Sequence, residues 1–213
     1  MMSQDDPTAE AIVYVVDDDA SVRESLRRII KSHGIQVTTF ESAREFLDWT
    51  RPEVPACLLL DVQMPDKTGF QLQEELVTNE VNLPIVFMTA HGDIPMTVKA
   101  MQKGAVNFLQ KPVNDDQLLE TIRMAIDRNV QDRKMSADQR EFLERVQSLS
   151  KREHEVMTQV ITGKLNKQIA RRLGITEYTV KVHRGRVMEK TGVPSLAELV
   201  RLCDRLGIAT ADE

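Results

Sequence analysis

The segment from Ala11 to Val16 is apolar or aromatic throughout, and three aspartates, Asp17, Asp18 and Asp19, follow it at once. An uninterrupted apolar run of this length predicts a strand buried on both faces, as in a parallel sheet covered by helices on both sides. Carboxylates this close to one another and to a core repel each other and lose hydration. We therefore expect a cation beside them.

Four further apolar runs follow along the chain, and segments with helical periodicity separate them. We expect strands over residues 11–16, 35–40, 56–61, 83–90 and 105–112. We expect helices over residues 21–33, 42–49, 70–78 and 95–103 and from residue 115 onward. Strands that alternate with helices in this way predict an α/β fold with a five-stranded, doubly wound parallel sheet.

Four of the five expected strands end in polar residues, namely Asp17 and Asp18, Asp61, Thr89 and Lys111. Ligands of a doubly wound sheet bind beyond the carboxyl ends of its strands. Carboxylates suit a hard divalent cation, and Mg²⁺ needs few protein ligands besides water. The turn after Asp61 can also bring the backbone carbonyl of Gln63 to such a metal. A carboxylate beside Mg²⁺, with an amine and a hydroxyl group nearby, is equipped to accept a phosphoryl group.

Two protein families place aspartates in this way. Haloacid-dehalogenase-type phosphohydrolases end their first strand in DxDx[TV], to which residues 17–21 correspond loosely. Residues 11–128 resemble instead the receiver domain of two-component response regulators. The resemblance consists of VVDD at the first strand end, LLLDVQMPDKTGF around Asp61, MTAHGD after the fourth strand and FLQKP after the fifth. The hydrolase interpretation leaves Asp61 and its MP turn unexplained.

The resemblance implies a role for each polar strand end. Asp61 would be the phosphoacceptor, and Asp17, Asp18 and the Gln63 carbonyl would position Mg²⁺ with it. The remaining expected roles are pairing with the phosphoryl group for Lys111, before a cis peptide at Pro112, movement toward a phosphoryl oxygen for Thr89, and an aromatic switch for Phe108. Asp19 is expected to be a solvated acid at the start of a helix, and His91 an exposed loop residue.

The charge distribution suggests a second domain with an anionic partner. Residues 1–129 carry a net charge of −9, and residues 151–213 carry +4. Residues 113–162 contain neither proline nor glycine, which predicts that the last helix of the first domain continues into a helical linker. Its heptads are too weak to decide whether it pairs between protomers. We expect domains at residues 1–128 and 149–213 and a helical linker at residues 129–148.

Residues 166–190 have the pattern of two helices joined by a short glycine turn, a helix-turn-helix. Asn166 and Thr176 are expected to cap the two helices, and Gly174 to end the first. At about 100° per residue, Val180 and Val187 face inward. The expected outward residues, suited to the major groove of DNA, are Tyr178, Lys181, Val182, Gly185 and Arg186. The expected phosphate contacts are Lys164, Lys167, Arg171, Arg172 and Arg184.

Residues 149–206 resemble the four-helix DNA-binding domain of the LuxR/NarL type. The shared motifs are LSKREHEV, NKQIARRLGI, TVKVHR and SLAELVRL. Gly185 departs from related members, which carry a basic side chain at that position. The whole chain therefore resembles a response regulator of the FixJ/NarL family.

This resemblance implies a cytoplasmic transcription factor rather than an enzyme. Its expected partners are a sensor histidine kinase, a second copy of the chain, inverted-repeat double-stranded DNA and RNA polymerase, with Mg²⁺ as cofactor and no membrane. Cys57 and Cys203 are expected to be reduced core residues, and no apolar run is long enough to cross a bilayer. Two alternatives stay open: a DNA-binding regulator that needs no phosphorylation, and a phosphohydrolase.

Overall fold

The computed structural model describes residues 10–90 and 94–208, with the backbone alone at residues 94–96 and 99. The chain forms two compact units that divide between Arg133 and Lys134. Each unit has apolar clusters of its own. Among the described residues, none of the helices combines the length and the apolar character that a membrane span requires. The expected loop residue His91 lies outside the described residues.

The first unit contains a parallel sheet with the strand order β2-β1-β3-β4-β5. Its strands are β1 (Ile12–Val16), β2 (Gln36–Phe40), β3 (Ala56–Asp61), β4 (Ile85–Thr89) and β5 (Asn107–Gln110). The predicted doubly wound α/β fold is thus confirmed. The strand order reverses between β1 and β3, which is where ligands of such sheets bind. Val16 pairs with Leu60, so the residues that follow, Asp17 and Asp61, come side by side at that point.

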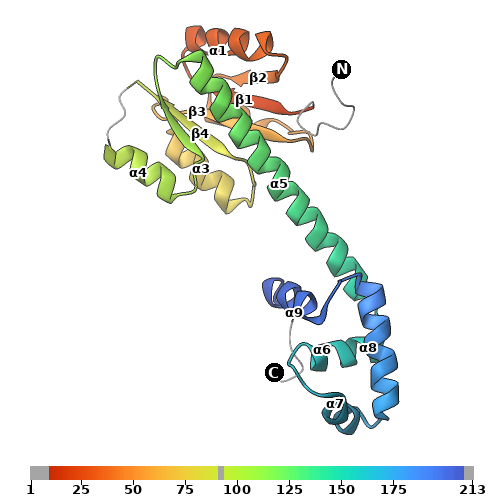
Figure 1. Ribbon diagram of the computed structural model, residues 1–213. Helices are drawn as coiled ribbons and strands as arrows, with labels where there is room; N and C mark the ends of the chain where they lie inside the picture. The colour runs from red at the N-terminus through yellow and green to blue at the C-terminus, as the bar shows by residue number, and fades with distance from the viewer. Residues whose placement is uncertain (1–9, 91–93, 209–213) are drawn as a thin grey trace. The chain divides into compact units, whose positions relative to one another are not determined.

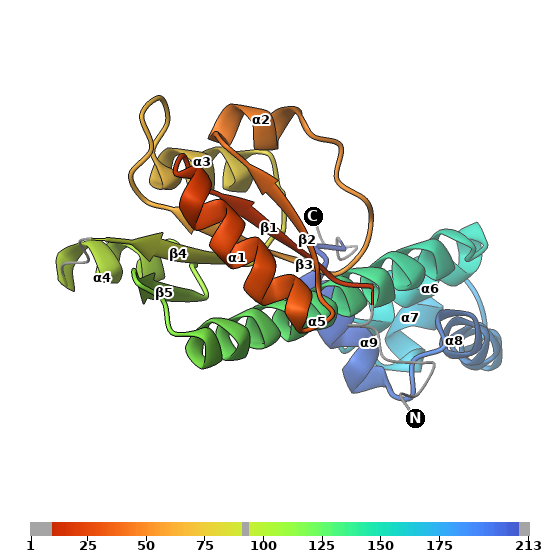
Figure 2. The same cartoon turned by 90° about the horizontal axis from the view of Figure 1, so that it is seen from above.

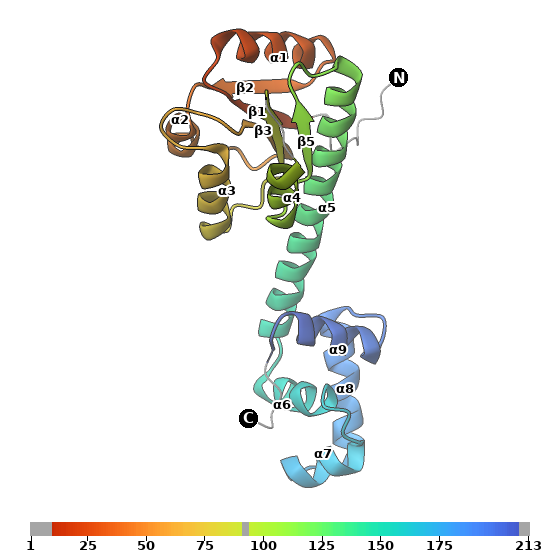
Figure 3. The same cartoon turned by 90° about the vertical axis from the view of Figure 1, so that its left-hand side faces the viewer.

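Helices cover both faces of the sheet (Figures 2 and 3). One face carries α1 (Ala20–Ser32) and α5 (Asp115–Gln147), and the other carries α2 (Ala43–Asp48), α3 (Gly69–Thr78) and α4 (Ile94–Gln102). Alternate residues of β1 enter the two cores. Val13 and Val15 belong to the cluster of α1 and α5, whereas Tyr14 and Val16 belong to the cluster of α2 and α3. This double burial explains why the opening apolar run has no polar interruption.

The second unit is helical (Figure 1). Its helices are the end of α5, α6 (Lys151–Val160), α7 (Asn166–Leu173), α8 (Glu177–Thr191) and α9 (Leu196–Arg205). Residues Phe142 and Val146 of α5 pack in one apolar cluster with α8 and α9. A second cluster joins α6, α7 and the start of α8. The four helices after residue 149 confirm the predicted all-α domain, and the expected linker is helical through Gln147.

Local signals explain where these helices begin and end. Ser150 and Glu153 form the expected capping box of α6, and Thr176 caps α8. Gly174 ends α7 with a φ of +64°, in the left-handed region that glycine adopts without strain. Cys57 and Cys203 are buried and free, as expected.

Candidate functional site

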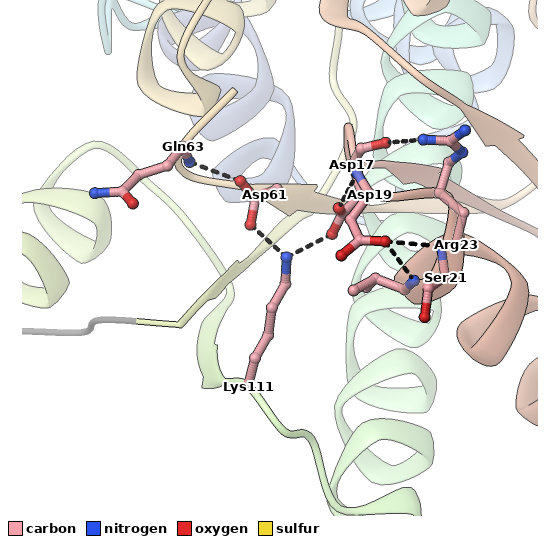
Figure 4. A network of polar contacts seen from close by, with 8 residues as sticks. Asp17, Asp19, Ser21, Arg23, Asp61, Gln63 and Lys111 are labelled. Carbon is pink, nitrogen blue, oxygen red and sulfur yellow. Dashed lines mark hydrogen bonds and ion pairs between the residues drawn. The ribbon is translucent and has the colours of Figure 1, made fainter. Parts of the chain in front are cut away.

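Three charged side chains from three strand ends meet at the carboxyl edge of the sheet (Figure 4). Asp17 follows β1 and is fully buried, and Asp61 ends β3 and is 5% exposed. Lys111 follows β5 and reaches between them. Its Nζ lies 2.6 Å from Asp17 Oδ2 and 2.5 Å from Asp61 Oδ1. The expected cation beside the aspartates is therefore, in the first instance, the Lys111 ammonium group.

Backbone and side-chain donors fix the two buried carboxylates and the turn beside them. The Asp19 N–H donates to Asp17 Oδ1 at 3.0 Å, and the Gln63 N–H donates to Asp61 Oδ2 at 2.7 Å. Arg23 of α1 donates from Nη1 to the Asp17 carbonyl oxygen at 2.7 Å. Asp19 itself accepts from Ser21 N–H at 2.8 Å and is the N-cap of α1. Asp19 is thus the exposed helix-start acid that we expected.

The electrostatics of the group follow from one ammonium shared by two buried carboxylates. Burial raises the pKa of Asp61, and the attraction and hydrogen bond of Lys111 offset only part of that effect. Burial by itself would lower the pKa of Lys111, but its bonds to Asp17 and Asp61 outweigh burial and raise it. Lys111 therefore stays charged, and its single ammonium group serves two carboxyl groups.

The two other expected members of the site lie on β4 and β5. Thr89 ends β4 and is 1% exposed, and its carbonyl oxygen accepts from the Lys111 N–H at 2.7 Å. Phe108 is half-buried on β5, and its ring centroid lies 6.5 Å from that of Phe87. The Lys111–Pro112 peptide bond is cis, as expected.

A close approach of backbone to backbone holds the turn after Asp61. The Gly69 N–H, at the start of α3, donates to the Val62 carbonyl oxygen at 3.0 Å. A Cβ atom at Gly69 would overlap the Asp61 carbonyl oxygen and crowd Leu60 and Phe87. Only glycine fits there, so α3 begins directly against the residue that ends β3.

The second group of expected site residues lies on α8. Val180 and Val187 are buried, at 0% and 1% exposure, as the periodicity predicts. The expected outward residues Tyr178, Lys181, Val182, Gly185 and Arg186 are all exposed. Tyr178 is 77% exposed. This combination of cations, an aromatic ring and an aliphatic side chain on one solvent-facing stripe is suited to a DNA groove.

The start of α7 differs from the prediction. Asn166 is not the N-cap: α7 begins at Asn166, and Leu165 is the N-cap without a side-chain cap bond. The Gln168 side chain instead accepts from the Leu165 N–H at 2.8 Å. Asn166 is engaged elsewhere, because its Oδ1 accepts from Arg184 Nη1 at 2.9 Å. A side chain with a partner on a neighbouring helix is no longer available to cap its own.

The expected phosphate contacts have different degrees of exposure. Lys167, Arg171 and Arg172 are exposed, whereas Lys164 and Arg184 are half-buried. The spacing of Arg184 in the sequence indicated that it is partly buried, although its charge suggested a phosphate contact. Arg184 comes four residues after Val180 and three before Val187, so helical periodicity places it beside the buried stripe.

Comparison with known proteins identifies the family. A family model described as the response regulator receiver domain matches residues 13–123, more than half of the chain. The chain belongs to the response regulator family. A second model, described as bacterial regulatory proteins of the luxR family, matches residues 147–203. This response regulator therefore combines a receiver domain with a LuxR-type DNA-binding domain.

Similar proteins cover more than nine tenths of the response regulator. Nodulation protein W of Bradyrhizobium diazoefficiens is 46% identical over 95% of this chain and 89% of its own length. The transcriptional regulatory protein FixJ of the same organism is 42% identical over 94% of this chain and 98% of its own. The solved structure of the response regulator StyR is 47% identical, covers 92% of this chain and 99% of its own, and has a TM-score of 0.75.

The receiver site offers oxygen ligands suited to Mg²⁺. Within the described residues, no three His, Cys, Asp or Glu side chains gather closely enough to hold a metal. Asp17 and Asp61 are buried, while Asp18 is exposed. Each oxygen of the two buried carboxylates accepts one hydrogen bond and keeps a second lone pair that can bind a cation. Two or three carboxylates, offset by a single ammonium, match a hard divalent cation that keeps most of its waters.

The response regulator also contains site residues that the motifs did not reveal. Arg23 supports the Asp17 backbone from the first turn of α1. In the sequence, only its position a few residues after the aspartates could have indicated this contact. Leu165 is 69% exposed at the start of α7. The sequence shows only that a leucine stands between two lysines. Its exposure follows from its position as the N-cap of α7, which the structure gives.

Proposed function

We propose that this response regulator is a transcription factor switched by phosphorylation of Asp61. The observation that carries the proposal is the Lys111 ammonium group, held within 2.6 Å of two buried carboxylates at the point where the strand order reverses. The domains are taken as residues 1–128 and 149–213, with residues 129–148 as a helical linker.

In the phosphorylation step, a carboxylate oxygen of Asp61 attacks the phosphorus atom of a phosphohistidine in a partner kinase. The P–N bond breaks, its electron pair stays on the imidazole, and the imidazole takes up a proton. Lys111, already bonded to Asp61 Oδ1, turns its N–H donors to the incoming phosphoryl oxygens. Asp17, Asp18, Asp61 and the Gln63 carbonyl would hold a Mg²⁺ ion, which would supply positive charge to those oxygens.

The Thr89 and Phe108 side chains couple this chemistry to the surface of the receiver. The Thr89 hydroxyl moves to a phosphoryl oxygen, and Phe108 turns into the space that this movement vacates. The surface formed by α4, β5 and α5 changes, and dimers become favoured. The modification is stoichiometric and falls on the chain itself, so the protein acts as a cytoplasmic regulator rather than as an enzyme.

The dimer then places two α8 helices in successive major grooves of an inverted-repeat DNA. Lys181, Val182 and Arg186 contact base edges, with Tyr178 at the start of the helix and Gly185 between them. Lys164, Lys167, Arg171 and Arg172 neutralise phosphates. RNA polymerase is the expected further partner on promoter DNA.

Intact mass measured after mixing the protein with acetyl phosphate and Mg²⁺ tests the receiver chemistry. We expect a gain of one phosphoryl group in the wild type, and no gain without Mg²⁺ or in Asp61→Asn. Sustained release of inorganic phosphate from phosphate esters would favour the phosphohydrolase alternative instead. Lys111→Met should reduce the rate of phosphorylation although Asp61 is intact.

A DNA shift assay separates the proposal from the phosphorylation-independent alternative. The wild type treated with acetyl phosphate should shift DNA at a lower protein concentration than the untreated wild type. Asp61→Asn should behave like the untreated wild type under both conditions. Equal affinity in all four measurements would show a regulator that binds DNA without phosphorylation.

A further inference from the structure

An arginine from a neighbouring helix holds each end of α7. At the C-terminal end, Arg152 Nη2 of α6 donates to the Leu173 carbonyl oxygen at 2.5 Å. At the N-terminal end, Arg184 Nη1 of α8 donates to Asn166 Oδ1 at 2.9 Å. Two fixed points determine the direction of a helix axis. These bonds therefore act together with apolar packing in orienting α7 against α6 and α8.

Apolar packing fixes only part of this arrangement. The buried residues of α7, Ile169 and Ala170, lie in its middle and meet Val180 near the start of α8. The first turn of α7 has no such anchor: its N-cap, Leu165, is 69% exposed and makes no side-chain cap bond. The bond between Asn166 and Arg184 joins this first turn to the middle of α8.

Arg184 lies on the inner side of α8 rather than on the outward stripe. It is half-buried and lines a small hollow with Val160 of α6 and Leu199 of α9. Arg186, only two residues further along, is exposed. The two arginines of α8 thus point to different environments.

We infer that Arg184 and Asn166 are positioning residues for DNA recognition. Their bond sets the angle at which α8 presents its outward stripe, and Arg184 is not one of the phosphate contacts. This inference rests on the proposed function, in which α8 reads DNA. Loss of the bond lets α8 tilt against α7, which weakens contacts to base edges and leaves the number of neutralised phosphates unchanged.

DNA binding at several salt concentrations tests the inference in the full-length, phosphorylated protein. The probes are a duplex that the wild type selects from a randomised pool and a duplex with the same bases in scrambled order. Arg184→Ala and Asn166→Ala should each lower affinity for the selected duplex about tenfold, the size of one disrupted base contact. Affinity for the scrambled duplex and the slope of log K against log salt should stay at their wild-type values.

Arg171→Ala is the matched control, because it removes the same side chain from an exposed position that we propose contacts a phosphate. Its loss should lower affinity for both duplexes equally and reduce the salt slope by about one. Asn166→Asp is the conservative variant: it keeps an acceptor for Arg184, so its preference for the selected duplex should match that of the wild type. A double variant, Asn166→Ala with Arg184→Ala, should lose no more preference than either single variant.

Two results would overturn the inference. One is a salt slope in Arg184→Ala that falls by about one with equal loss on both duplexes, which would make Arg184 a phosphate contact. The other is a loss of unfolding free energy in the double variant that equals the sum of the losses in the two single variants. Such additivity would show that the two side chains do not interact. If the wild type selects no sequence from the pool, the proposal that α8 recognises DNA bases fails. The unfolding free energies of the wild type, the two single variants and the double variant would still show whether the two side chains interact.

Discussion

Lys111 shares one positive charge between two buried carboxylates, Asp17 and Asp61. In the interior a charge that lacks a partner costs several kilocalories per mole, of order 3–5 kcal/mol when one partner of a buried pair is removed. The arrangement therefore stores an unfavourable charge in the resting receiver. A divalent cation or a proton relieves it, and this need explains why Asp17 and Asp61 are buried side by side.

Asp61→Asn should raise the free energy of unfolding of the Mg²⁺-free protein at pH 7, by about 1 kcal/mol. Burial raises the pKa of Asp61, so the folded state carries at pH 7 a charge that folding disfavours. A group with a raised pKa contributes stability that is present at low pH and lost as pH rises through the folded pKa. The advantage of the variant should therefore shrink as pH falls.

Urea unfolding in EDTA, across a pH series, measures this difference. Lys111→Met is the opposing control and should lose about 3 kcal/mol or more, because it leaves both carboxylates without a cation. An Asp61→Asn variant that is less stable than the wild type at every pH would show that the Lys111 pair outweighs burial.

The residues of the receiver site could be predicted from sequence because strand ends converge. Asp17, Asp61, Thr89 and Lys111 each follow an apolar run, and a doubly wound sheet brings such ends to one edge. Asn166 and Arg184 could not be assigned in the same way. Asparagine before a helix usually caps it, and an arginine on a DNA-reading helix usually meets phosphate. The bond between them depends on how two helices cross, which no local pattern encodes.

The same glycine-to-alanine substitution should have opposite effects on stability at Gly69 and at Gly185. Gly69→Ala should cost about 2 kcal/mol of stability, because the new Cβ overlaps the Asp61 backbone at the start of α3. It should also slow phosphorylation, since the turn after Asp61 has to move. Gly185 lies on the exposed side of α8 with open space around it. Gly185→Ala should therefore raise the free energy of unfolding by about 0.5–1 kcal/mol.

Thermal unfolding of the two alanine variants and the rate of acyl-phosphate formation check this pair. The two glycines serve as controls for each other, because the substitution is the same and only the surroundings differ. Equal effects on stability would mean that the approach of Gly69 to Asp61 is not a constraint.

The start of α6 and the end of α8 are joined by an ion pair. Glu153 is 3% exposed, and its Oε2 accepts from Lys190 Nζ at 2.7 Å and from the Ser150 N–H at 2.9 Å. The hydrogen bond from Lys190, with that from the Ser150 backbone, lowers the pKa of Glu153 from 4.5 to about 2. Glu153→Gln keeps the capping acceptor and loses the charge, so it should cost about 1 kcal/mol at neutral pH.

A depressed pKa contributes stability that is present above the unfolded value and lost as pH falls through the folded value. The difference in melting temperature between the wild type and Glu153→Gln should therefore disappear between pH 4.5 and about 2. Glu155→Gln is the matched control on the same helix. Its partner Arg152 lies 2.6 Å away in a partly exposed pair. Solvent screens such a pair, so the substitution should change the melting temperature far less than Glu153→Gln does.

At the level of elements, the sequence predicted which segments form strands better than where they end. β4 was expected over residues 83–90 and spans Ile85–Thr89, and β5 was expected over 105–112 and spans Asn107–Gln110. The apolar run is longer than the hydrogen-bonded ladder because flanking residues such as Ala105 are buried as well. Pro84 has no N–H to donate to a ladder, and its place as the second residue of the expected run was a signal for the later start.

The two units of the molecule carry opposite charge. Residues 1–133 have a net charge of −9 and residues 134–213 of +4. The basic unit has a core of its own, while the acidic unit repels the same DNA that the basic unit attracts. Charge and motifs predicted this division from sequence. How strongly the acidic unit weakens DNA binding by the basic unit depends on the distance between its charges and the DNA, which the composition does not give.

A fragment of residues 134–213 should bind a scrambled duplex more tightly than the unphosphorylated full-length chain at low salt. The difference should shrink as salt rises, because the Debye length falls from about 30 Å at 0.01 M to about 8 Å at 0.15 M. Fluorescence anisotropy with a labelled duplex measures both proteins. A difference that stays constant with salt would indicate steric obstruction rather than repulsion between charges.

Lys111 follows β5, the last strand of the sheet, whereas its partners Asp17 and Asp61 lie at the ends of β1 and β3. On the ribosome, therefore, the aspartates emerge long before their cation does. A nascent chain that stops short of residue 111 would have to bury two like charges to close its sheet. The receiver can complete its fold only after its final strand has been synthesised, so translation to that point acts as a checkpoint on folding.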